Sequence, residues 1–203
     1  MSARDAILAR LRDAALSTDR EAEAQRLIET VERPALMGDR IDIFLQALSG
    51  ATVSATHDRI ATLADLPGAV ARYMAGQRLA PALFLPPDPQ VAACDWSGFA
   101  RHHRSASDEP AALAVARGGV AETGSLVLDT GPNAPMLPNF LCLHLIVLLR
   151  AETIVAHLED IPQADAPPRA HYWVTGVSGT TDIEGQYVRG AHGPRYLHVI
   201  LLG

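Results

Sequence analysis

Two long apolar runs in the C-terminal half place the strongest limit on what this chain can fold into. Leu141–Leu149 and Leu197–Leu202 are almost continuously aliphatic. A strand has this composition when both of its faces are covered, as in a parallel sheet packed between helices. The two runs therefore predict an α/β fold with a buried, mostly parallel sheet.

Shorter patterns alternate between helix and strand along the rest of the chain. Three helices are expected early: one from a Ser2–Asp5 capping box, one between Asp19 and Pro34, and one near Asp39–Leu48. Further strands are expected at Thr52–Thr56, Ala82–Leu85, Ala112–Ala116, Ser125–Leu128 and Tyr172–Thr175, helices at Ile60–Met74 and Thr153–Leu158, and loops at Pro86–Pro89 and Pro162–Pro168. The pattern predicts one domain over residues 1–203, with a helical N-terminal extension over about residues 1–48.

Charge and cysteine content argue against several classes of protein. The chain has 17 Lys and Arg against 23 Asp and Glu, and no basic run. Nucleic acid and membrane surfaces are therefore not expected as partners. Cys94 and Cys142 lack metal-site spacing, so no metal, cofactor or iron–sulfur cluster is expected on this chain. Leu141–Leu149 is too short to cross a bilayer and the N-terminus lacks an apolar signal segment, so a cytoplasmic location is expected.

The first candidate site is the glycine-rich segment Gly118–Ser125, which precedes an expected strand. Glycine lets a ligand approach the backbone, and a carboxylate such as Glu122 there can act as nucleophile or general base. Thr123, Gly124 and Ser125 would then contact the ligand. The alternative is a tight turn with Glu122 in solvent.

The second candidate site is the hydroxyl-rich segment Thr175–Glu184, which follows an expected strand. Open α/β sheets place ligands in such loops, and a helix starting here could hold an anion on its backbone N–H groups. The candidate ligand contacts are Gly176, Ser178, Gly179, Thr180, Thr181, Asp182 and Glu184. The alternative is that Thr181–Glu184 is only the capping box of that helix.

The third candidate site is Gly190–Pro194, before the last strand. His192 titrates near neutrality and could move a proton or hold an anion, with Gly193 beside it. The alternative is a Gly-Pro turn with an incidental histidine. His144, inside an apolar run, is expected to be a hydrogen-bonded core residue.

Taken together, these strings resemble the lactate-utilisation protein C family, whose shared unit is the LUD domain. The resemblance rests on Ala121–Leu128, Leu137-Pro138, His144, Ile154-Val155, Gly176-x-Ser178, Thr181–Glu184 and Gly190–Pro194. Their order and spacing match over about Leu113–Leu202. One departure is Val177, where the family usually has proline, which would stiffen that loop.

The resemblance implies a three-layer α/β/α fold similar to CoA transferases and sugar-phosphate isomerases. It also implies an accessory role in oxidising L-lactate to pyruvate, beside a partner subunit that carries iron–sulfur clusters. Two other functions stay open: a free-standing CoA-transferase-like enzyme that uses Glu122, and a module that binds a small anionic ligand through Ser178–Thr181 and His192. Each requires the three candidate segments to converge in one cleft, expected at the carboxyl ends of the strands.

Overall fold

The chain divides into two compact units, Met1–Ala35 and Leu36–Gly203. The computed structural model describes residues 3–13, 20–29, 33–102, 104, 109–163, 167–190 and 192–203. The first unit contains helices α1 (Ala3–Asp13) and α2 (Arg20–Glu29), in agreement with the two helices expected there. The capping residues expected for them, Ser2 and Asp19, lie outside the described residues.

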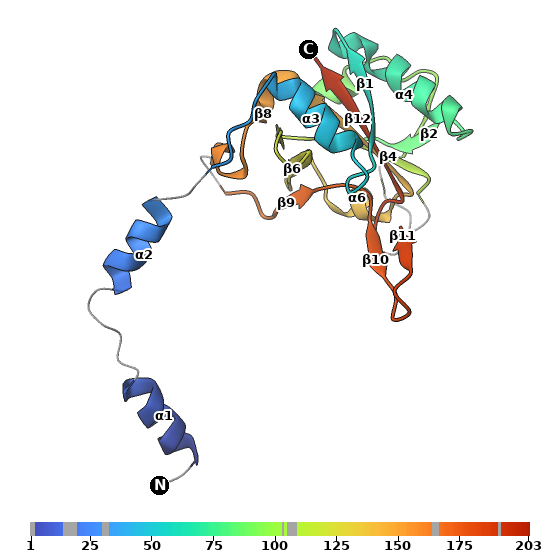
Figure 1. Cartoon of the computed structure of the whole chain (residues 1–203). Coiled ribbons are helices and arrows are strands. Elements are labelled where there is room, and N and C mark those ends of the chain that lie inside the picture. Colours follow the sequence, from blue (N-terminus) through green and yellow to red (C-terminus); the bar gives the residue numbers. More distant parts are fainter. Residues whose placement is uncertain are drawn as a thin grey trace. The chain divides into compact units, whose positions relative to one another are not determined.

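A six-stranded parallel sheet forms the centre of the second unit (Figure 1). Its order is β1 (Thr56–Ile60), β12 (Tyr196–Leu202), β7 (His144–Arg150), β4 (Ala111–Val115), β2 (Ala82–Phe84) and β3 (Ala100–His102). The two long apolar runs form β7 and β12, which are adjacent and have neighbours on both sides. The α/β class and the mostly parallel sheet are thus confirmed.

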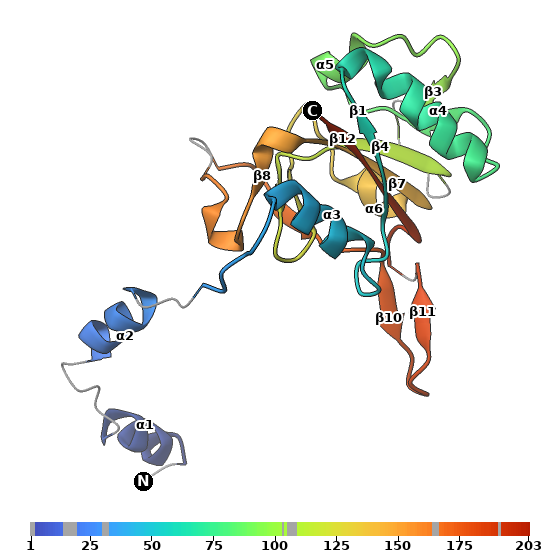
Figure 2. The same cartoon turned by 45° about the horizontal axis from the view of Figure 1, so that its top comes forward.

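A smaller sheet and a hairpin complete the strands. The four-stranded sheet has the order β8 (Ile154–Val155), β5 (Gly118–Val120), β6 (Ser125–Asp129) and β9 (His171–Val174), with β6 antiparallel to both of its neighbours. Strands β10 (Gly179–Thr181) and β11 (Tyr187–Arg189) form an antiparallel hairpin. Figures 1 and 2 show this hairpin extending away from the two sheets.

The side chains of the central sheet divide between two hydrophobic clusters. Ile146 and Leu148 of β7 pack with helices α4 (Leu66–Gly76) and α5 (Pro89–Ala92). Leu145 and Val147 point to the opposite face, because successive side chains alternate along a strand. They pack with α3 (Arg40–Ser49) and with the four-stranded sheet. The second unit therefore has three layers, with the central sheet in the middle.

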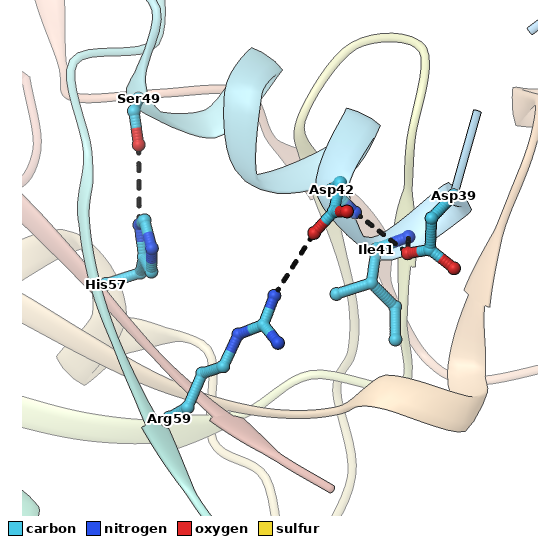
Figure 3. Close-up of polar contacts among 6 residues, drawn as sticks. All are labelled: Asp39, Ile41, Asp42, Ser49, His57 and Arg59. Atoms are coloured by element: carbon cyan, nitrogen blue, oxygen red, sulfur yellow. Dashed lines mark hydrogen bonds and ion pairs between the residues drawn. The ribbon is translucent and has the colours of Figure 1, made fainter. Parts of the chain in front are cut away.

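Helix α3 is fixed at its start and along its exposed side by polar contacts (Figure 3). Asp39 caps the helix, since its Oδ1 accepts the N–H groups of Ile41 and Asp42 at 2.9 and 3.1 Å. The carboxylate of Asp42 lies 3.5 Å from the Arg59 guanidinium on β1. The helix expected near Asp39–Leu48 is confirmed with its cap.

Three expected elements are wrong or displaced. Thr52–Thr56 is mostly a turn, and strand β1 starts at Thr56, because Ser54 has a left-handed φ of 54°. Ile60–Met74 is helical only from Leu63, since Thr62 and Asp65 form a capping box there. Thr153–Leu158 is not a helix but strand β8 between two 3-10 turns, including Ala151–Thr153.

The helix expected after Thr181 is also wrong. This segment is the turn of the β10–β11 hairpin, because Asp182 Oδ1 accepts the N–H groups of Glu184 and Gln186, and Gly185 adopts a φ of 80°. The same residue types that cap helices also form such side-chain turns. The backbone N–H groups of a helix N-terminus are therefore not available here to an anion.

His144 is buried and hydrogen-bonded, as expected. Its Nδ1 lies 2.9 Å from the Tyr73 hydroxyl of α4, and its ring stacks on Tyr196. Tyr73 in turn stacks on His198, whose Nδ1 lies 2.8 Å from the Thr56 hydroxyl. These rings close the amino end of the central sheet on its α4 face. Among the described residues, no helix is both long and apolar enough to cross a membrane.

Candidate functional site

A cavity of about 200 Å³ lies where two of the three candidate segments meet. Gly176 and Ser178, which follow β9, line one part of it. His192 and Gly193, which precede β12, line another part. The remaining lining residues that bear on its chemistry are Asn139, Phe140, Tyr172, Thr175, Leu145 and Leu197. The structure thus brings four of the predicted site residues together.

Backbone hydrogen bonds across the base of the hairpin hold these two segments in place. The Ser178 N–H donates to the Pro194 carbonyl at 2.8 Å, and the Gly190 N–H donates to the Ser178 carbonyl at 2.7 Å. The His192 N–H lies 3.4 Å from Ser178 Oγ. The pairing of β10 with β11 therefore positions His192 beside Ser178.

Gly176 is required because its backbone packs against the turn that precedes strand β1. It has a φ of 102°, and a Cβ at this position would lie 2.7 Å from the Val53 carbonyl oxygen. The Val177 N–H donates to that same oxygen at 3.1 Å. The first glycine of this segment therefore serves a close backbone approach, which is a structural role.

Five predicted ligand residues lie on the hairpin and do not line the cavity. Thr180, Thr181, Asp182 and Glu184 lie along its strands and turn, where Asp182 forms the turn described above. Gly179 lies under the ring of Tyr187. The convergence expected for the whole Gly176–Glu184 segment is therefore limited to its first residues.

Glu122 is bonded to a different part of the chain. Its Oε2 lies 2.9 Å from His157 Nδ1, and its Oε1 accepts the Leu158 N–H at 2.9 Å. The hydrogen bond from His157, followed by the backbone bond from Leu158, lowers the pKa of Glu122. An ionised carboxylate with both oxygens bonded is suited to joining two loops, and Glu122 is not among the residues that line the cavity.

Three hydroxyl groups connect the Glu122 loop to the cavity. Ser125 Oγ lies 2.6 Å from Thr123 Oγ1 and 2.6 Å from Thr175 Oγ1, and Thr175 lines the cavity. Ser125 is buried, so the middle one of the three hydroxyl groups is shielded from water. Gly124, which lies between Thr123 and Ser125 in the sequence, has a φ of 67° and packs against α3. A Cβ at this position would lie 2.7 Å from the Leu48 nitrogen.

The cavity lies at the amino ends of the central strands. Leu145 and Leu197 are the second residues of β7 and β12. The expectation that the candidate segments meet at the carboxyl ends is therefore wrong. Its physical reason is that β9, which leads into the site, belongs to the smaller sheet and is antiparallel to β6.

The lining of the cavity suits a small, weakly charged group. Phe140, Leu145 and Leu197 supply apolar surface, and the described lining contains no Lys, Arg, Asp or Glu. The hydroxyl of Tyr172 accepts a 2.7 Å hydrogen bond from the Asn139 amide, and burial raises the Tyr172 pKa. His192 is the one histidine among the described lining residues.

Sequence reasoning missed Asn139 and Tyr172 as lining residues, and it included Thr175 in the second candidate segment without naming it as a ligand contact. Tyr172 carried a usable signal, since it lies at the start of an expected strand directly before the Gly176 segment. Asn139 carried none, because it comes from helix α6 (Leu137–Leu141), within a segment rich in Gly and Pro. Within the described parts of the chain, no group of three His, Cys, Asp or Glu residues could hold a metal ion.

Comparison with known proteins decides the family. The model of the LUD domain family matches residues 100–202, which is half of the chain. The chain belongs to the LUD domain family. The resemblance drawn from the sequence strings is thereby confirmed, and the matched LUD region contains both the cavity and the Glu122 loop.

Two relatives of this LUD domain come from Deinococcus radiodurans. The chain is 34% identical over 92 residues to Lactate utilization protein C of that organism, a match covering 41% of this chain and 42% of that protein. The chain thus matches less than half the length of this curated relative. The crystal structure of a DUF162 family protein is similar in fold, with a TM-score of 0.55 and 17% identity over 84% of this chain and 100% of that one.

Proposed function

We propose that this chain is an accessory subunit of a cytoplasmic L-lactate utilisation system and acts beside a partner that carries iron–sulfur clusters. The observation that carries the proposal is the 34% identity to Lactate utilization protein C, within a region matched by the LUD family. The cavity beside Ser178 and His192 supports it, because Gly176, Ser178 and His192–Pro194, which belong to two of the family strings, line it.

The proposed reaction requires more than this chain supplies. Oxidation of L-lactate to pyruvate removes two electrons and two protons. The electrons would pass to the clusters of the partner, since four thiolates normally hold such a cluster and this chain has two cysteines. The part left to this chain is binding, orientation and proton transfer, for which His192 is a candidate.

Growth on L-lactate as the sole carbon source tests the proposal. Deletion of the gene is expected to abolish growth on L-lactate and to leave growth on pyruvate unchanged. Complementation with the wild-type chain is expected to restore growth. The Ser178→Ala/His192→Ala double variant, at equal protein level, is expected to restore it poorly.

Co-purification provides the second arm of the test. A tagged full chain is expected to retain a partner that contains iron and acid-labile sulfide.

For the growth experiment, Arg59→Gln, on the exposed edge strand β1, is the matched control variant and should complement fully. Normal growth on L-lactate after deletion would contradict the proposal.

The geometry does not favour the acyl-transfer alternative. A glutamate that forms an acyl-enzyme needs a carboxylate oxygen free to attack the thioester. His157 and the Leu158 N–H occupy both oxygens of Glu122. Incubation with acyl-CoAs is expected to leave the intact mass of the chain unchanged.

A further inference from the structure

A second titratable pair lies on the four-stranded sheet, away from the family strings. Asp129, the last residue of β6, lies opposite His171, the first residue of β9, in the antiparallel register. Asp129 Oδ1 is 2.6 Å from His171 Nδ1. Because a carboxylate only accepts hydrogen bonds, Nδ1 carries a proton, and in the neutral imidazole Nε2 then keeps its lone pair for a ligand.

A guanidinium group completes this cluster. Arg117, in the connection between β4 and β5, places Nη1 3.5 Å from Asp129 Oδ2. The side chains of Arg117, Asp129 and His171 are 25%, 24% and 34% exposed, so the cluster is partly shielded from water. A guanidinium carries five N–H donors, which leaves Arg117 able to bind a second carboxylate.

Arg117 and His171 open into a groove of about 420 Å³. Trp173, two residues after His171 on the same face of β9, contributes its indole, and its ring meets the His171 ring edge-on at 5.3 Å. Leu158, Ile161, Pro162 and Pro168 add apolar surface to the lining of the groove. The single acid among the described lining residues is Glu159, which is exposed and therefore screened by solvent.

We propose that the groove beside Arg117, His171 and Trp173 binds a small carboxylate that bears a hydroxyl group on the adjacent carbon. The Arg117 guanidinium binds the carboxylate, and the hydroxyl of the ligand donates to His171 Nε2. Asp129 is a positioning residue that fixes the tautomer and orientation of His171 and keeps Arg117 nearby. The groove is thereby assigned as the substrate site of the proposed lactate function, and this assignment rests on that proposed function.

The distribution of charge favours this groove over the cavity beside Ser178. The described lining of the cavity has no arginine or lysine, whereas the groove has a guanidinium and an imidazole on one wall. A buried or half-buried carboxylate needs a paired cation. The groove of about 420 Å³ is also large enough for a three-carbon acid.

Titration of the full chain with small acids tests the inference through the fluorescence of Trp173. Trp96→Phe serves as the background, so that Trp173 is the single tryptophan. L-Lactate is expected to change the emission in a saturable way, and propionate, which lacks the hydroxyl, is expected to bind at least tenfold more weakly. Arg117→Gln is expected to lose binding of both acids at least tenfold. His171→Phe is expected to weaken lactate and leave propionate unchanged.

Two matched variants keep the test specific. Arg195→Gln and Arg59→Gln, both outside the groove and outside the cavity beside Ser178, are expected to bind lactate as the background does. Thermal unfolding of each variant checks that it is folded, and Arg117→Met, which also removes the charge but keeps a long side chain, replaces Arg117→Gln if the latter is not. Wild-type lactate affinity in a folded Arg117→Gln chain, or equal affinity for lactate and propionate, would overturn the inference.

The two proposals fail separately. If lactate binds in the groove but deletion leaves growth on lactate normal, the binding site is supported and the lactate-utilisation role is contradicted. If deletion abolishes growth and lactate does not perturb Trp173, the role stands and this site falls.

Discussion

Glu122 and His157 join two loops that are 35 residues apart through a 2.9 Å contact between Oε2 and Nδ1. The same carboxylate accepts the Leu158 N–H, so it fixes the segment that follows β8 against the segment that precedes β6. The carboxylate with the strongest catalytic signal in the sequence therefore has a structural role in the fold.

We expect Glu122→Gln to lower the free energy of unfolding by about 1 kcal/mol, because the amide keeps the shape but loses a charge-assisted hydrogen bond. Urea unfolding at pH 7 measures the change, with Glu159→Gln as the exposed neighbouring control. The contribution of Glu122 should also fade as pH falls below the ordinary Glu range, since its pKa is lowered in the folded state. A Glu122→Gln curve that overlays the wild type would contradict the structural role.

Acid should destabilise the protein through His198. Burial lowers the pKa of His198 from 6.5 to about 4. Between these two pH values the unfolded chain therefore binds a proton at His198 and the folded chain does not. The free energy of unfolding is therefore not reduced by His198 above pH 6.5, and it falls by up to about 3 kcal/mol as pH falls towards 4. Unfolding free energies measured across that range should fall less steeply for His198→Gln than for wild type. Gln77→Ala, at the exposed C-terminal end of α4, changes no titratable group and should keep the wild-type slope.

Gly124→Ala should destabilise the fold by more than about 2 kcal/mol. The new Cβ would meet the backbone of α3 at 2.7 Å from the Leu48 nitrogen, and the residue would have to keep a φ of 67°. Gly98→Ala is the matched control, because a Cβ there has nothing within 4 Å. Thermal unfolding of the two variants makes the comparison, and similar melting temperatures would argue against the close packing of this loop.

Cys142 should not react with thiol reagents in the native protein. It is 2% exposed, and burial raises its pKa to about 12, so almost no thiolate is present at neutral pH. Intact mass after treatment with iodoacetamide is expected to show at most one modification, at the partly exposed Cys94. Two modifications should appear only in denaturant. Rapid double labelling under native conditions would refute this.

The sequence predicts the central sheet well because its strands are specified by burial on both faces. Leu141–Leu149 and Leu197–Leu202 contain most of β7 and β12, although β7 begins only at His144 because Leu141 ends α6. Asp39 identifies the start of α3 through its side-chain chemistry. The smaller elements are less predictable. The segment after Thr181 satisfies both a helix cap and a hairpin turn, and pairing of Gly179 with Arg189 selects the hairpin.

The candidate site is predictable only where neighbouring strands bring its parts together. Ser178 and His192 both lie close in sequence to hairpin strands, so pairing of the hairpin places them side by side. The partner of Glu122 depends on the parallel pairing of β5 with β8, and the Asp129–His171 contact depends on the register of β6 with β9. Register in a short strand is set by tertiary packing, which local patterns do not record.

The order of strands in the central sheet has a consequence for biosynthesis. Among the described strands, β1 pairs with β12 alone, and Thr56 of β1 is separated in the sequence from its partner His198 by 142 residues. Until β12 is synthesised, the central sheet is therefore incomplete, and the backbone edges of β1 and β7 that pair with β12 have no partner. Such a topology favours slow, late folding and gives chaperones a defined interval in which to act.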